Sequence, residues 1–168
     1  MRALRIALTV LTLSSCSRGA VVDHLSINVS DSTAHAMARQ SACSVSYELR
    51  AAAGAKGSLS ATCTCVRADA PGAPAAARTQ TSRILTLDES LGLLKAARKA
   101  DVMGLSITSG SADCDRGQVF QIAGVSGSKT NTSVISRCSN PARLQGFLDL
   151  VQDTTASMVL PCGPDGPA

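Results

Sequence analysis

Aromatic side chains are almost missing from this chain of 168 residues, which has no tryptophan, one tyrosine and two phenylalanines. Proteins that hold nucleic acid by base stacking need exposed aromatic rings on a positively charged surface. Sugar-binding sites depend on flat aromatic faces in a similar way. The composition therefore argues against nucleic acid as a partner and gives little support to sugar binding.

Long apolar runs are missing as well, and a helix needs about 20 apolar residues to cross a bilayer. The apolar run at residues 6–13 is far shorter, and Arg2 and Arg5 precede it. A basic start, a short apolar run and small residues before a cleavage site are the marks of a secretion signal. We therefore predict that residues 1–15 are a signal peptide and that no helix spans the membrane. Their removal lowers the formal net charge from +4 to +2, which is not the basic excess of a nucleic-acid-binding protein.

The junction Leu13-Ser14-Ser15-Cys16 resembles the signal of bacterial lipoproteins, in which a branched apolar residue and two small residues precede a cysteine. The resemblance implies cleavage before Cys16, a diacylglyceryl thioether on its sulfur and an acyl chain on the new amino group. Two or three acyl chains anchor a protein stably, whereas one chain holds only marginally. The alternative is a plain secreted protein in which Cys16 stands at this position by chance.

The residue that follows the predicted lipidation site bears on location. Ser17 stands where an aspartate would favour the inner membrane, so the outer membrane is the preferred destination. We expect a lipid-anchored protein of a bacterial cell envelope, with its domain in the periplasm or at the cell surface.

If Cys16 is lipidated, six of the seven cysteines remain for other roles. An even number of cysteines in an oxidising compartment predicts disulfides. The six are Cys43, Cys63, Cys65, Cys114, Cys138 and Cys162. We expect Cys114–Cys138 as one bridge, Cys43 with either Cys63 or Cys65 as the second, and Cys162 with the remaining cysteine as the third.

Metal binding is the competing interpretation of Cys63 and Cys65, with His24 or His35 in support. A C-x-C pair alone lacks the paired spacing of structural zinc sites, and the compartment and the even count both favour bridges. We therefore expect neither a metal ion nor another cofactor.

Apolar and polar residues alternate along most of the remaining sequence, and this two-residue period is typical of half-buried strands. The alternation predicts strands at residues 24–30, 43–50, 57–66, 79–87, 118–125 and 131–138. Hairpin connections are expected at residues 51–57, as a slightly long loop, and at 126–130. Residues 31–42 are expected to form a loop or a short turn of helix.

Two segments have the features of helices. Thr86 and Glu89 match a capping box, which predicts a helix over about residues 87–100. Asn140 and Pro141 are typical of a helix start, and a helix is predicted over about residues 141–153. Two apolar stripes are expected to be buried. They are Leu87, Leu91, Leu94 and Ala97 or Ala100 in the first helix, and Leu144, Phe147, Leu148 and Val151 in the second.

Strands grouped before and between two helices predict an α+β protein, namely a small antiparallel sheet of hairpins packed by two helices and stabilised by disulfides. A chain of this length fits one domain. We expect a lipidated tether at residues 16–23, a single domain at residues 24–162 and a loose tail at residues 163–168.

Three segments of the sequence, LTLDESLGLLKAARKADVMGL, VFQIAGVSGSKTNTSVISRC and PARLQGFLDLV, follow one another as helix, hairpin and helix. With the hairpins that precede them, they give an architecture similar to that of small secreted proteins such as the emfourin-type metalloprotease inhibitors. The resemblance implies this order of elements. It consists of a hydrophobic pattern and transfers no functional residue.

Catalytic motifs are incomplete in this sequence. Residues 124–128, GVSGS, place Ser128 where the second glycine of a G-x-S-x-G elbow must stand. Asp113 and Asp115 lack the glycine and the distal glutamate of a calcium loop. We therefore expect no catalytic residue and no enzymatic activity.

Two functions are consistent with these observations. The first is a non-enzymatic binding or scaffolding module with a partner in the cell envelope. The alternative is a protease inhibitor anchored at the cell surface, because the exposed loop between Arg67 and Arg78 would offer a basic residue to a protease beside a bridged hairpin. Preorganised segments of this kind are what tight inhibitors use.

Overall fold

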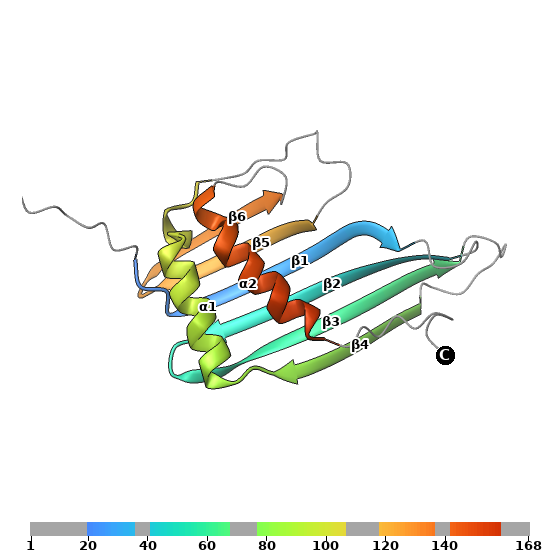
Figure 1. Cartoon of the computed structure of the whole chain (residues 1–168), viewed down its shortest axis with the longest axis horizontal. Helices are drawn as coiled ribbons and strands as arrows, with labels where there is room; N and C mark the ends of the chain where they lie inside the picture. The colour runs from blue at the N-terminus through green and yellow to red at the C-terminus, as the bar shows by residue number, and fades with distance from the viewer. Residues whose placement is uncertain (1–19, 36–40, 68–76, 107–117, 137–141, 159–168) are drawn as a thin grey trace, which may run out of the picture.

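A computed structural model of the protein describes residues 20–35, 41–67, 77–106, 118–136 and 142–158. Its core element is one antiparallel sheet in the order β4-β3-β2-β1-β5-β6 (Figure 1). The strands are β1 (His24–His35), β2 (Ser41–Ala52), β3 (Ala55–Arg67), β4 (Ala77–Ile84), β5 (Gln118–Ser126) and β6 (Lys129–Ser136).

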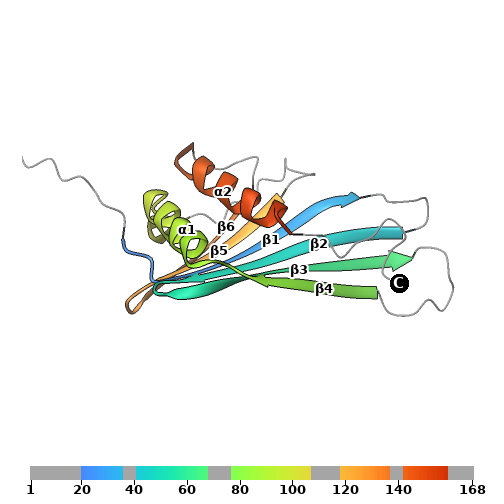
Figure 2. The same cartoon turned by 60° about the horizontal axis from the view of Figure 1, so that its bottom comes forward.

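Two α-helices, α1 (Leu87–Lys99) and α2 (Gln145–Ala156), lie on the same face of the sheet (Figure 2). Short 3-10 turns precede β5 and α2, at Val102–Gly104 and Ala142–Leu144. The predicted α+β class, with an antiparallel sheet packed by two helices, is confirmed.

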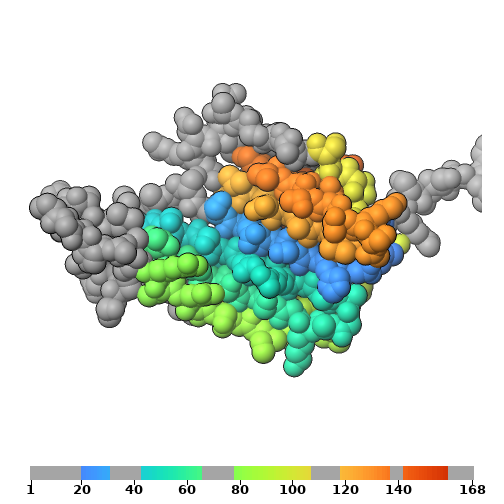
Figure 3. Space-filling model, turned by 180° about the vertical axis from the view of Figure 1, so that it is seen from behind, coloured from blue at the N-terminus to red at the C-terminus, as the bar shows by residue number. Residues whose placement is uncertain are grey.

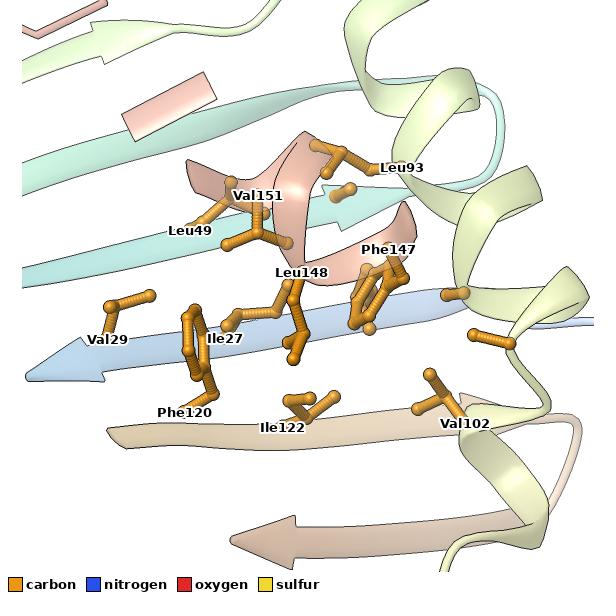
Figure 4. Packing of buried hydrophobic residues seen from close by; sticks show 14 of the residues in the cluster. Ile27, Val29, Leu49, Leu93, Val102, Phe120, Ile122, Phe147, Leu148 and Val151 are labelled. Atoms are coloured by element: carbon orange, nitrogen blue, oxygen red, sulfur yellow. The ribbon is translucent and has the colours of Figure 1, made fainter. Parts of the chain in front are cut away.

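The side chains beneath the helices come from alternate residues of each strand, as the two-residue period requires. Leu25, Ile27 and Val29 of β1 are buried, and so are Phe120 and Ile122 of the neighbouring β5. Figure 4 shows Phe147, Leu148 and Val151 of α2 packing over these side chains. Each such side chain contributes roughly 1.5–3 kcal/mol by leaving water, so this layer supplies most of the driving force for folding.

Helix α1 makes a close contact with the sheet at Gly57. The Gly57 N–H donates to Ser90 Oγ at 2.9 Å, and Ser90 is fully buried. A β-carbon at position 57 would collide with the Arg50 carbonyl oxygen and with Ser90 Oγ. The Gly57 carbonyl in turn accepts from the Leu85 N–H at 3.0 Å. One glycine therefore holds β3, the start of α1 and the connection between β4 and α1 together.

The predicted capping box of α1 is present. Thr86 Oγ1 accepts from the Glu89 N–H at 3.2 Å, and Glu89 Oε2 accepts from the Thr86 N–H at 2.7 Å. Glu89 also accepts from Arg83 Nη2 at 2.9 Å, and the same Arg83 nitrogen donates to Ser157 Oγ, just beyond α2. The hydrogen bonds from Arg83 and from the Thr86 backbone lower the pKa of Glu89 from 4.5 to about 2.

The buried stripe of α1 differs from the expected one: Leu93, Leu94 and Ala97 are buried, whereas Leu87 is 46% exposed and Leu91 is half-buried.

Three expected boundaries also differ from the structure. The connection between β2 and β3 is a two-residue turn at Ala53 and Gly54, not a long loop, because Gly54 adopts φ 72° and such turns need positive φ. Strand β1 continues to His35 through an irregularity in its pairing with β2, where a loop or helical turn was expected. Helix α2 begins at Gln145, later than predicted, because the 3-10 turn comes first.

Replacement of Ser90 by alanine is expected to cost roughly 1–3 kcal/mol of unfolding free energy, because it leaves the buried Gly57 N–H without an acceptor. Chemical denaturation of Ser90→Ala beside Ser82→Ala, an exposed serine of β4, measures the difference. Equal stability of the two variants would contradict the role given to this hydrogen bond.

The Glu89 carboxylate makes the free energy of unfolding depend on pH. Its pKa is lower in the folded state, so its contribution is complete above about pH 4.5 and is lost as the pH falls toward 2. Glutamine can still close a capping box, so Glu89→Gln removes the charge alone. We expect the variant to be less stable than the wild type by about 1 kcal/mol at neutral pH, and the gap to close near pH 2. Asp88→Asn on the same helical turn is the control.

Candidate functional site

The face of the sheet opposite the helices is crossed by none of the described elements. Figure 3 shows this open face, with β6, β5, β1, β2, β3 and β4 side by side. Its residues are exposed or half-buried and mostly carry hydroxyl or amide groups. They are Ser26, Asn28 and Ser30 of β1, Ser44 and Ser46 of β2, Ser58, Ser60, Thr62 and Thr64 of β3, Gln80 and Ser82 of β4, Gln121 of β5, and Thr130 and Thr132 of β6.

The strand register aligns these polar groups into rows across the sheet. One row runs Ser30, Ser46, Thr62 and Gln80, because each is the pairing partner of the next. Neighbouring strands lie about 4.8 Å apart, so the row presents hydrogen-bonding groups at that spacing. A hollow of about 290 Å³ lies along this row. The open face is thus a regular array of short donors and acceptors.

An ion pair between two residues of β2 lies on the open face. Arg50 Nε donates to Glu48 Oε1 at 2.8 Å, and both side chains are largely exposed. Glu48 borders the first hollow, and Arg50 borders a second one of about 410 Å³, lined also by His24 and Lys56. An exposed pair of this kind adds little stability. It places a local dipole on the face, whose other charged residues, Lys56 and Arg78, border the two hollows.

Exposed apolar side chains stand at the two edges of the open face. Ile84 on β4 is 70% exposed, and Val134 on β6 is 38% exposed. Both occupy positions whose pairing partners, Ser58 and Gln121, belong to the open face. The array of hydroxyl groups is therefore bordered by apolar groups that a partner would shield from water.

Among the described residues, the open face brings together neither paired carboxylates nor a nucleophile elbow. Glu48 is the one carboxylate among its described residues, and it is bound to Arg50. Paired carboxylates for acid–base chemistry are therefore not formed on this part of the chain. Ser126 ends β5 at the turn into β6, which is a hairpin and not the strand-to-helix turn of a nucleophile elbow.

A cluster of three sulfurs lies between β2 and β3 at the other end of the sheet. Cys43 and Cys65 are directly paired across the two strands and form a disulfide. Of the two pairings expected for Cys43, the structure has this one. Cys63 Sγ lies 3.6 Å from Cys65 Sγ. Cys63 is also disulfide-bonded, and its partner lies outside the described residues.

These sulfurs are the one group of three or more close ligand atoms found within the described ranges. A metal ion would need them as thiolates, and the bridge leaves neither Cys43 nor Cys65 in that form. The bridge closes a loop of 22 residues, which corresponds to about 3 kcal/mol in the chain-entropy model. The cluster braces the far end of the long β2–β3 hairpin.

Several predicted site residues lie outside the described part of the chain. These are Cys16, Cys114, Cys138, Cys162, Asp113 and Asp115. Arg67 and Arg78 lie at the end of β3 and inside β4, so the loop expected between them is a connection of two paired strands; its residues 68–76 are outside the described ranges. The lipidation site and the Cys114–Cys138 bridge stay predictions.

No sequence motif predicts the open face, although the alternating polar residues that form it can be seen in the sequence. Segments such as HLSINVS and SLSATCT repeat hydroxyl or amide groups at every second residue. That regularity predicts strands, each with one half facing solvent. Only the pairing of six strands shows that these halves meet in one continuous surface.

Comparisons with known proteins add no family to this description: no family model, no curated protein and no solved structure matches the chain. The helices of the described ranges all lack the combination of length and apolar character that crossing a bilayer takes.

Removal of the hairpin bridge in a Cys43→Ser, Cys65→Ser double variant is expected to lower the unfolding free energy by about 3 kcal/mol. Ser44→Ala, an exposed neighbour on β2, is the control and should unfold like the wild type. Peptide mapping without reductant should recover Cys43 linked to Cys65. A peptide that links Cys43 to Cys63 would contradict the pairing.

Proposed function

We propose that this protein is a lipid-anchored, non-enzymatic binding module of a bacterial cell envelope and that its open face holds a protein partner. The observation that carries the proposal is the asymmetry of the sheet. One face is filled by two helices, and the other is a broad array of hydroxyl and amide groups with apolar edges.

The chemistry of the open face favours association over simple solvation. The cores of protein interfaces are depleted in charged residues relative to the rest of the protein surface. Here the central rows of β1, β2 and β3 carry serine, threonine and asparagine, and Glu48 and Arg50 neutralise each other. Short side chains also lose little rotamer entropy on binding. A partner with its own hydrogen-bonding surface would fit such a face, either directly or through bridging water.

The anchor and the compartment rest on the residues at the start of the chain. Arg2, Arg5, the apolar run and the Leu13-Ser14-Ser15-Cys16 junction together have the order of a lipoprotein signal. The disulfide between Cys43 and Cys65 supports an oxidising compartment. Acylation at Cys16 would keep the module at the membrane while its open face meets the partner.

The protease-inhibitor alternative gains no observation of its own. Its inhibitory loop falls largely within residues 68–76, outside the described residues. The proposed function is therefore the binding module.

The binding role is tested by replacing two residues at the centre of the open face, in the variant Ser46→Arg, Thr62→Arg. The two side chains face each other across β2 and β3, so their bulk and charge would block a flat partner. We expect crosslinking in native envelopes to give a partner adduct with the wild type and with Lys95→Glu on α1, and to lose it with the double variant. An unchanged adduct in the double variant would show that the partner binds elsewhere.

The anchor is tested by Cys16→Ser. We expect this variant to incorporate no labelled palmitate and to leave the membrane fraction, whereas the wild type is labelled and membrane-bound. Native protein whose Cys16 carries no acyl mass would refute the anchor.

A further inference from the structure

Asp23, the residue that precedes β1, is held by three hydrogen bonds. Its N–H donates to the Val125 carbonyl at 2.7 Å, and its own carbonyl accepts from the Ala53 N–H at 2.8 Å. Its carboxylate Oδ2 accepts from the Gly127 N–H at 2.7 Å. Asp23 is thereby tied to both tight hairpin turns, the one between β2 and β3 and the one between β5 and β6.

These contacts gather three parts of the chain at one end of the sheet, which we call the tether end and define as residues 21–23, 53–56 and 126–130. Figure 1 shows β1 beginning there, at the end that α1 covers and opposite the end where β3 finishes. Turn residues Gly54 and Gly127 adopt φ 72° and 57°, which permits two-residue turns with little projection. The tether end is therefore compact and blunt.

The distance from the predicted anchor to this end is short. Six residues lie between Cys16 and Asp23, and the seven Cα–Cα steps that join them span at most about 25 Å. The disulfide end lies farther away, since the nine steps from Ser44 on β2 to Ala53 in the turn that follows it cover about 30 Å. An acylated Cys16 at the membrane surface therefore keeps the tether end near the headgroups.

The charge of the tether end complements an anionic surface. Lys56 and Lys129 are exposed, one in each turn region. Asp23 is the single acidic residue of the tether end, and its carboxylate is already bound to the Gly127 N–H. The other exposed residues of the two turns are small, so the backbone can approach closely. The tether itself adds Arg18.

We propose that the tether end docks on anionic lipid headgroups, with Lys56 and Lys129 against the lipid phosphates, so that the sheet stands away from the membrane. This inference rests on the proposed acylation of Cys16. Such an orientation keeps the open face and the disulfide end clear of the bilayer, where a partner can reach them. It also explains why the two turns nearest the anchor carry lysine and no uncompensated acid.

The absence of tryptophan makes the orientation measurable, because one introduced tryptophan is the sole indole of the protein. Ala53→Trp places the probe in an exposed turn of the tether end, and Ser44→Trp places a second exposed probe on β2 at the disulfide end. Acylated protein is reconstituted into vesicles of brominated phosphatidylglycerol and phosphatidylethanolamine. Ser128→Trp in the other turn repeats the measurement if Ala53→Trp does not fold.

We expect bromolipid quenching to be several-fold stronger at residue 53 or 128 than at residue 44. The excess should fall in neutral phosphatidylcholine vesicles, in 1 M salt, where the screening length is about 3 Å, and with Lys56→Gln, Lys129→Gln. Each lysine near an anionic surface contributes about a fivefold change in association. Arg78→Gln at the far end is the control and should change nothing.

Equal quenching at the two ends, or quenching at the tether end that is independent of lipid charge, would overturn the docking inference. Mass spectrometry of the same samples separates the two proposals. A chain with acyl mass on Cys16 and equal quenching refutes the docking alone, whereas a chain without acyl mass refutes the anchor and the docking together.

Discussion

The antiparallel register of the six strands is the constraint on which the other features of this protein depend. Because side chains alternate between the two faces, the pairing of Ile27 with Leu49 and with Ile122 places all three under the helices. The same register places Asn28, Glu48 and Gln121 on the open face. A slip of one residue in any strand would exchange its apolar and hydroxyl halves. Burial of the apolar half therefore fixes the arrangement of the polar half.

The two ends of the sheet are held by different means. At the tether end, Asp23 joins the incoming chain to both hairpin turns by three hydrogen bonds, and Gly57 brings α1 close to the sheet. At the other end, the helices no longer cover the long β2–β3 hairpin, and the Cys43–Cys65 bridge is buried there outside the main core. The disulfide therefore holds β2 and β3 together where the helices no longer pack on the sheet.

Local features of the sequence predicted much of the fold. The capping box predicts the start of α1 at Leu87, where the structure has it, because a cap acts over a single turn. Helix α2 was placed too early, because its first turn is a 3-10 turn and Leu144, the last residue of that turn, is packed in the core. The β2–β3 loop was predicted too long, since the strand pairing continues almost to Gly54. The end of β1 was missed because its pairing with β2 resumes at His35 after an irregularity.

By itself, the sequence determined which residues of each strand share a face, where α1 begins, and which sulfurs could meet in the β2–β3 hairpin. These properties follow from periods of two or 3.6 residues and from contacts between near neighbours in the chain. Only the tertiary structure decided that β1 lies between β2 and β5, that Cys43 pairs with Cys65, and that the hydroxyl halves of separate strands form one surface. The place of β1 and the continuity of the surface depend on pairing between β1 and β5, which lie nearly a hundred residues apart in the chain. The choice of Cys65 over Cys63 depends on the exact register of the β2–β3 hairpin, which no local pattern specifies.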